Sequence, residues 1–177
     1  NNTDTLTVGS SAYSLTQFHI HMPSENHVGS NSYPAEIHLV YKDKQGKFAV
    51  VGIFVKAGAA NTTLATLIQA IDKQKHPSKQ SLTRISKAKN SKKVKGKTNG
   101  LVINANDLLP SDSNTYYSFM GSLTTPPCTG GIQWYVLANP ITASAAQLKA
   151  LQAFYGNNAR PTQPINGRDV SYKPPVT

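Results

Sequence analysis

An alternation of apolar and polar side chains over residues 12–22 predicts a β-strand. Successive side chains of a strand point to opposite faces of its sheet. An unbroken strand therefore places two sets on opposite faces: Tyr13, Leu15, Gln17, His19 and His21 on one, and Phe18, Ile20 and Met22 on the other. The two histidines of this strand then point in the same direction.

Two more strands are predicted directly after this one. The first covers residues 35–41, and its alternation places one set of side chains on a shared face: Glu36, His38 and Val40. The second covers residues 47–56, which are dense in β-branched and aromatic residues. Residues 42–46 lie between them and have the composition of a hairpin turn.

Two helices and two shorter strands are predicted farther along the chain. Apolar residues recur at helical spacing over residues 62–73, and Ser144 is suited to be the N-cap of a second helix. Apolar runs predict strands over residues 101–104 and over Ile132–Leu137. Strands outnumber helices and the hairpin connections are short. The expected fold class is therefore mainly β with peripheral helices (α+β), around a central, largely antiparallel twisted sheet.

The length and the distribution of charge narrow this picture. A chain of 177 residues is expected to form a single domain, and no apolar run approaches the roughly 18 residues of a membrane span. The net charge of +10 is concentrated, because residues 73–106 hold ten of the 18 basic residues and none of the acidic ones. Basic and acidic residues balance elsewhere, so we interpret residues 73–98 as an exposed, Lys-rich loop insertion and do not expect a basic surface over the whole protein.

Three histidines are candidate metal ligands. His19 and His21 project from one face of a strand, and His38 on a neighbouring strand can supply a third nitrogen. Three neutral imidazoles with a fourth position left for water are the arrangement of a catalytic zinc site. An isolated His-x-His pair is, however, more often a surface or core pair that binds no metal.

Three separated motifs decide between these alternatives. They are QFHIHMPSE at residues 17–25, YPAEIHLV at 33–40 and GSLTTPPC at 121–128. In this order they closely resemble the alpha-class carbonic anhydrases of the bacterial type, and the similarity extends through residues 48–58 and through RPTQPINGR at 160–168. The resemblance implies the sheet of the alpha-carbonic anhydrase fold, with zinc (Zn²⁺) as the cofactor.

The resemblance assigns roles to individual residues. It implies that His19, His21 and His38 are the zinc ligands, and that Gln17 and Glu36 are hydrogen-bond partners of His19 and His38. It also implies that Thr124 accepts a hydrogen bond from zinc-bound hydroxide and donates one to Glu25. The substrate-binding residues that it implies are Val40, Val50, Leu123, Thr125, Ile132 and Trp134.

The implied activity is that of a lyase. Zinc-bound hydroxide would attack carbon dioxide, which gives bicarbonate and a proton in a reversible reaction. Side activity on esters is expected, as is inhibition by sulfonamides and simple anions.

The sequence also departs from the family pattern. Only 18 residues precede His19, so we expect residues 1–177 to be one carbonic anhydrase domain without the N-terminal part of the family domain. Cys128 lies where secreted relatives often place a disulfide cysteine, which favours a periplasmic or secreted protein and a disulfide partner in that N-terminal part. A homodimer is one expected way to cover a sheet exposed by a short chain. Asn26 replaces the histidine that usually follows the glutamate of the first motif.

An alternative function is a non-catalytic, carbonic anhydrase-like module that binds polyanions through residues 73–98. Family members that have lost activity typically lack a zinc histidine, and all three histidines are present in this chain. The enzyme is therefore the favoured interpretation.

Overall fold

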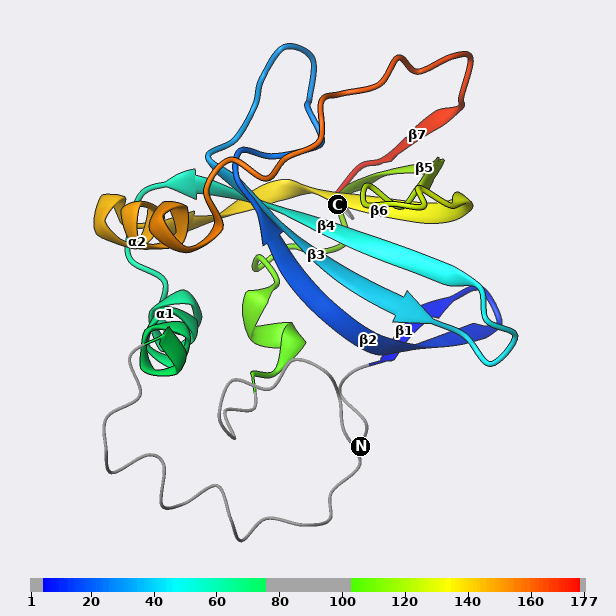
Figure 1. Cartoon of the computed structure of the whole chain (residues 1–177). Helices are drawn as coiled ribbons and strands as arrows, with labels where there is room; N and C mark the ends of the chain where they lie inside the picture. Colours follow the sequence, from blue (N-terminus) through cyan, green and yellow to red (C-terminus); the bar gives the residue numbers. More distant parts are fainter. Residues whose placement is uncertain (1–4, 76–102, 176–177) are drawn as a thin grey trace, which may run out of the picture.

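The computed structural model describes residues 5–75 and 103–175 and contains one curled sheet of seven strands in the order β1-β2-β3-β4-β6-β5-β7 (Figure 1). The strands are β1 (Thr5–Val8), β2 (Ser11–His21), β3 (Ala35–Lys42), β4 (Phe48–Ala57), β5 (Tyr116–Ser122), β6 (Gly130–Ala143) and β7 (Val170–Lys173). Every neighbouring pair is antiparallel except β4 and β6, which are parallel. The expected mainly-β fold with a largely antiparallel sheet is confirmed.

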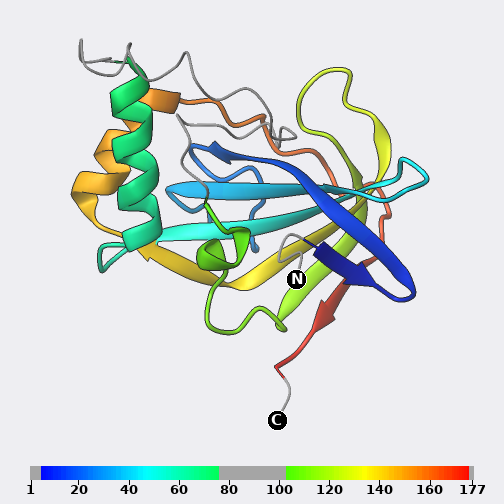
Figure 2. The same ribbon diagram turned by 90° about the horizontal axis from the view of Figure 1, so that it is seen from below.

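The helices lie against one face of this sheet. Helix α1 (Thr62–Lys75) and helix α2 (Ala145–Tyr155) pack side by side at one end, and the short 3-10 helix η2 (Ala105–Leu108) lies beneath the middle of the sheet (Figures 1 and 2). Ser144 is the N-cap of α2, as predicted, and forms a capping box with Gln147. No helix in the described ranges is long and apolar enough to cross a membrane.

The sheet separates two clusters of buried apolar side chains. The cluster on the helix side includes Ile20, Ile37, Leu39 and Ile53 from the strands, together with Leu64, Leu108 and Leu151 from the helices. The cluster on the opposite face consists of Val40, Val50, Phe54, Ile132, Trp134 and Val136. Odd and even positions of β3 therefore contribute to different clusters, as period-two alternation requires.

A bulge in β2 corrects one prediction. The pairing of β2 with β3 advances from Leu15 opposite Tyr41 to Gln17 opposite Val40, so Thr16 is an extra residue that interrupts the alternation. Tyr13 and Leu15 consequently pack against the helix-side cluster and not on the face of the histidines. The phase predicted for residues 17–22 is correct, whereas the phase predicted for residues 13–15 is wrong.

Some predicted strands differ from the observed ones, and some predictions concern residues outside the described ranges. Residues 103–104 of the strand predicted over 101–104 are irregular, because Asn104 caps η2 and accepts a hydrogen bond from Asn106 N. The sequence patterns did not predict β1, β5 or β7.

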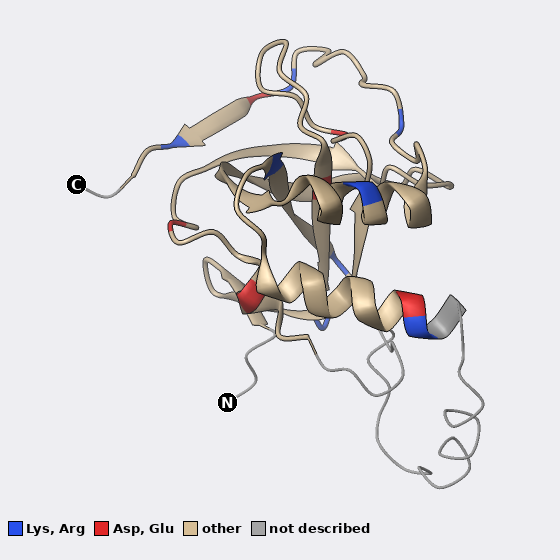
Figure 3. Cartoon of the chain, turned by 90° about the vertical axis from the view of Figure 1, so that its left-hand side faces the viewer, with Lys and Arg blue, Asp and Glu red and all other residues tan. Residues whose placement is uncertain are grey.

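Lys and Arg are scattered among Asp and Glu over the described part of the chain (Figure 3), and residues 76–98 of the Lys-rich segment lie outside it. Polyanion binding by residues 73–98 therefore stays a prediction.

Candidate metal centre

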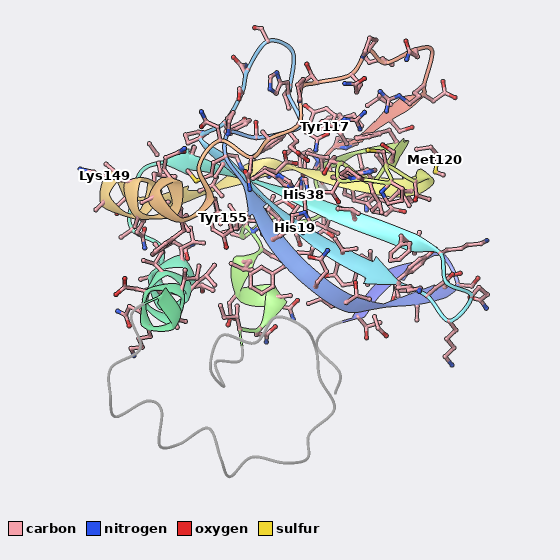
Figure 4. All side chains as sticks on the ribbon, in the orientation of Figure 1. His19, His38, Tyr117, Met120, Lys149 and Tyr155 are labelled. Carbon is pink, nitrogen blue, oxygen red and sulfur yellow. The ribbon has the colours of Figure 1, made fainter. Side chains whose placement is uncertain are left out.

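His19, His21 and His38 meet on the face of the sheet that is opposite the helices. The pairing of β2 with β3 places His19 directly opposite His38, and their side chains lie next to each other (Figure 4). One potential ligand atom from each of the three residues lies within 4.8 Å of the other two. His21 and His38 are only 3% and 1% exposed, so two of the three imidazoles are almost completely shielded from solvent.

Hydrogen bonds orient His19 and His21. Nδ1 of His19 lies 2.8 Å from Oε1 of Gln17, and Nδ1 of His21 lies 3.3 Å from the backbone oxygen of Asn158. Both partners are acceptors, so we assign the imidazole proton to Nδ1 in each case. This assignment leaves the lone pair of Nε2 free, and Nε2 of His21 is buried without any hydrogen-bond partner in the described structure.

In His38 the two ring nitrogens have the opposite roles to those in His19 and His21. Its Nε2 lies 3.3 Å from Oε1 of Glu36, an electrostatic contact that is not a hydrogen bond in the structure. A carboxylate at this side favours the tautomer with the proton on Nε2, which leaves the lone pair on Nδ1. The partner that the resemblance implied for His38 is therefore adjacent to it.

The carboxylate of Glu36 is fully buried and has several donors. Its Oε2 accepts hydrogen bonds from the backbone nitrogens of Glu25 at 2.9 Å and Asn26 at 2.8 Å, and its Oε1 accepts one from Nδ2 of Asn26 at 2.7 Å. Burial alone would raise the pKa of Glu36, but the nearby His38 and the donors of Asn26 outweigh it, so the pKa is lowered. Glu36 is consequently ionised at neutral pH.

The environment keeps two of the imidazoles neutral. Burial is the largest cause and repulsion from His38 and His21 the next, and together they lower the pKa of His19 from 6.5 to about 3. Burial, followed by repulsion from His38, also lowers the pKa of His21. A divalent metal requires deprotonated imidazole nitrogens. The three residues therefore fit a zinc ion by ligand type and separation, and His19 and His21 fit it by protonation as well. The unpartnered Nε2 of His21 is the observation that supports this fit most directly.

Glu25 and Thr124 lie beside the histidines, although the hydrogen bond expected between them is not formed. The Glu25 side chain is 4% exposed, its Oε1 is 3.2 Å from His21 Nδ1, and the same oxygen accepts a 2.8 Å bond from Arg160 N. Its Oε2 is buried and has no hydrogen-bond partner within the described ranges. Thr124 is half-buried and lines a cavity together with Glu25, so both residues border the same space although no hydrogen bond joins them.

A small cavity of about 250 Å³ opens beside the histidines. His19 and His38 line it, and so do most of the residues predicted to bind substrate: Val40, Val50, Leu123, Thr125 and Trp134, together with Thr124. Ile132 belongs to the same apolar cluster but does not line the cavity. The cavity wall is mostly apolar, which suits a small uncharged molecule.

A larger cavity of about 690 Å³ lies farther along the same face. It shares Thr124 and Trp134 with the smaller cavity and reaches Glu25, but none of the three histidines lines it. The smaller cavity is therefore the one that adjoins the candidate metal ligands.

Sequence reasoning missed two residues that support the centre. The side chain of Asn158 accepts a hydrogen bond from Met22 N at 2.8 Å and donates one to Ile20 O at 3.0 Å, so it clamps the end of β2. Gly52 lies opposite His38, where an added Cβ would be 2.7 Å from Glu36 Oε1. The only sequence signal for Asn158 was its position two residues before the motif at 160–168.

Comparisons with known proteins agree with this arrangement. The family model of the eukaryotic-type carbonic anhydrases matches residues 2–174. A carbonic anhydrase of Klebsiella pneumoniae is 40% identical over 168 residues, which are 94% of this chain and 61% of that protein. The chain thus spans about three fifths of the length of this relative.

Solved structures give the same result. The alpha-carbonic anhydrase of Photobacterium profundum is 37% identical, with a TM-score of 0.73 over 96% of this chain and 74% of that one. The alpha-carbonic anhydrase of Thermovibrio ammonificans, solved in complex with the inhibitor sulfanilamide, is 32% identical, with a TM-score of 0.73 over 96% of this chain and 72% of that one. The fold of the chain is therefore shared with this family over almost all of its length.

Proposed function

This chain belongs to the eukaryotic-type carbonic anhydrase family, and we propose that it catalyses the reversible hydration of carbon dioxide to bicarbonate and a proton. The observation that carries the proposal is the convergence of His19, His21 and His38, whose candidate ligand atoms lie within 4.8 Å of one another. Zinc is the metal that we propose for this centre, since three neutral nitrogens with one open position are the usual ligand set of a catalytic zinc ion.

A zinc ion held by these three histidines would supply hydroxide near neutral pH, because zinc lowers the pKa of bound water to about 7, an effect for which carbonic anhydrases themselves are the reference case. The protein's contribution is to hold the three ligands in the correct tautomer. We assign this role to Gln17 for His19, to the Asn158 carbonyl for His21 and to Glu36 for His38.

The remaining residues act on the substrate and on the nucleophile. In this proposal, carbon dioxide lies in the small cavity against Val40, Val50 and Trp134. The part of the wall that these residues form is mostly apolar, so it offers few groups that could hydrogen-bond to the nucleophile. In the active protein, Thr124 accepts a hydrogen bond from the attacking oxygen and donates one from its hydroxyl to Oε2 of Glu25. The structure does not contain this second bond, and Oε2 has no other hydrogen-bond partner among the described residues. This pair orients the nucleophile, and Thr125 contacts the bicarbonate product.

Inhibition and location follow from the family. Because the Thermovibrio ammonificans relative binds sulfanilamide, we propose that sulfonamides, and simple anions as well, inhibit this protein. Slow hydrolysis of activated esters is a proposed side reaction. The proposed location is periplasmic or secreted, on the basis of the position of Cys128.

Two measurements on the same sample test the proposal. Elemental analysis should find one zinc ion per chain, and stopped-flow assays should show carbon dioxide hydration that a sulfonamide blocks. Ester hydrolysis alone does not discriminate, because an unrelated zinc hydrolase would also show it. Zinc-loaded protein that hydrolyses esters but does not hydrate carbon dioxide would refute the proposed reaction.

A further inference from the structure

Asn26 forms no hydrogen bond with any of the three histidines in the described structure, but it supplies two of the donors that hold Glu36. Its backbone nitrogen binds Oε2 at 2.8 Å and its side-chain Nδ2 binds Oε1 at 2.7 Å. Oε1 is also the oxygen that lies 3.3 Å from Nε2 of His38. The side chain of Asn26 therefore acts on the same oxygen atom that faces the metal ligand.

Apart from Nε2 of His38 itself, no other side-chain donor in the described structure faces Oε1 of Glu36. The remaining bond to Glu36 comes from the backbone of Glu25 and reaches the other oxygen, at 2.9 Å. On the side of β4, Gly52 contributes no side chain that could hold the carboxylate. Since Glu36 is fully buried, water does not reach Oε1 easily if the amide of Asn26 is removed.

The chemistry of the amide suits this position. Nδ2 of an asparagine is a hydrogen-bond donor at every pH, whereas an imidazole donates only from the nitrogen that carries the proton. Asn26 stands at a position where the family that this chain resembles usually has histidine. This chain therefore holds the Glu36 carboxylate with an amide, which can donate a hydrogen bond at every pH. A residue that fixes an outer-shell carboxylate affects the metal through the ligand that the carboxylate orients.

We propose that Asn26 is a positioning residue of the metal centre, which fixes Oε1 of Glu36 against Nε2 of His38 and thereby sets how long the centre retains zinc. This inference rests on the proposed zinc site. It concerns the retention of the metal and the tautomer of His38, not the reaction itself.

The test compares zinc release from the full chain in five forms: wild type, Asn26→Leu, Asn26→Asp, Asn26→His and Asn31→Leu. Each zinc-loaded protein is mixed with excess chromogenic chelator. Asn26→Leu removes the donor and should release zinc about 10–100-fold faster, the usual effect of losing an outer-shell partner. Asn26→Asp preserves the shape but turns an oxygen toward Glu36, so its release should be at least as fast. Asn26→His restores a donor and should retain zinc nearly as the wild type does.

Asn31→Leu is the matched control, because Asn31 is exposed in the same loop and pairs with Val28 through backbone atoms. It should release zinc at the wild-type rate. Equal acceleration by Asn31→Leu and Asn26→Leu would overturn the proposal, since it would indicate a loop effect. So would wild-type release from both Asn26→Leu and Asn26→Asp.

A second readout does not require metal. Imidazole ¹⁵N chemical shifts of the metal-free protein should place the His38 proton on Nε2 in the wild type and in Asn26→His, and should show mixed tautomers in Asn26→Leu. Unchanged shifts in Asn26→Leu would contradict the positioning role. If the wild type bound no zinc, the proposed function would fail, while these shifts would still decide whether Asn26 orients His38 through Glu36.

Discussion

Replacing Gly52 with alanine should weaken zinc binding without unfolding the protein. Gly52 pairs with His38 across β3 and β4, and a Cβ added there would lie 2.7 Å from Oε1 of Glu36 and 3.4 Å from Cγ2 of Val136. The first contact is shorter than real Cβ contacts, whereas the second is ordinary. The methyl group would therefore act mainly on the Glu36 carboxylate.

The size of the effect follows from these distances. To reach an ordinary contact of 3.4 Å, Oε1 would have to retreat by roughly 0.7 Å in a closely packed interior. Such a shift disturbs the 2.7 Å bond from Asn26 and the 3.3 Å contact with His38. Overpacking of this kind costs about 1–3 kcal/mol of stability, and the loss of an outer-shell partner lowers metal affinity about 10–100-fold.

Gly58→Ala provides the control. Its added Cβ would lie 2.9 Å from Cγ2 of Thr142, a similarly close contact that involves no residue of the metal centre. Chelator competition should show a zinc affinity about 10–100-fold lower in Gly52→Ala and unchanged in Gly58→Ala, while urea unfolding should show a loss of stability of about 1–3 kcal/mol in the first variant. Wild-type zinc affinity in Gly52→Ala, or an equal loss in Gly58→Ala, would refute this reasoning.

Three further predictions concern the ligands and their surroundings. His38→Ala should lose bound zinc and carbon dioxide hydration together, as measured by elemental analysis and stopped-flow assay, and retention of both would reject His38 as a ligand. Thr124→Ala should keep zinc but hydrate carbon dioxide about 10–100-fold more slowly, as expected for a group that acts through orientation, and an unchanged rate would remove that role. The metal-free protein should lose stability as the pH falls below 6.5, because the pKa of His19 is lowered from 6.5 to about 3 and the unfolded chain therefore binds more protons in this interval. Urea midpoints measured at pH 7.5 and 5 should show this decrease, and His19→Gln should make it smaller; an equal decrease in that variant would contradict the assignment.

Local patterns in the sequence were sufficient to predict much of the fold and the candidate metal ligands. The alternation of β3, the helical spacing of α1 and the N-cap at Ser144 depend on residues that are close in the chain, and all three appear in the structure where they were predicted. The three histidines were identified from the spacing of His19 and His21 together with the resemblance of three motifs. A period of two places both side chains on one face whatever surrounds the strand.

Contacts between residues that are far apart in the sequence could not be predicted from local patterns. The bulge at Thr16 moves Tyr13 and Leu15 to the opposite face of the sheet. The hydrophobic pattern of a strand does not show where such an extra residue lies. The carbonyl of Asn158 reaches His21 from 137 residues away, and the closeness of Gly52 to Glu36 exists only because β3 and β4 pair in one register. The sequence by itself therefore determined which groups can bind a metal. Only the packing of distant segments decided how those groups are oriented, because hydrogen bonds and steric contacts depend on distances that the chain acquires when it folds.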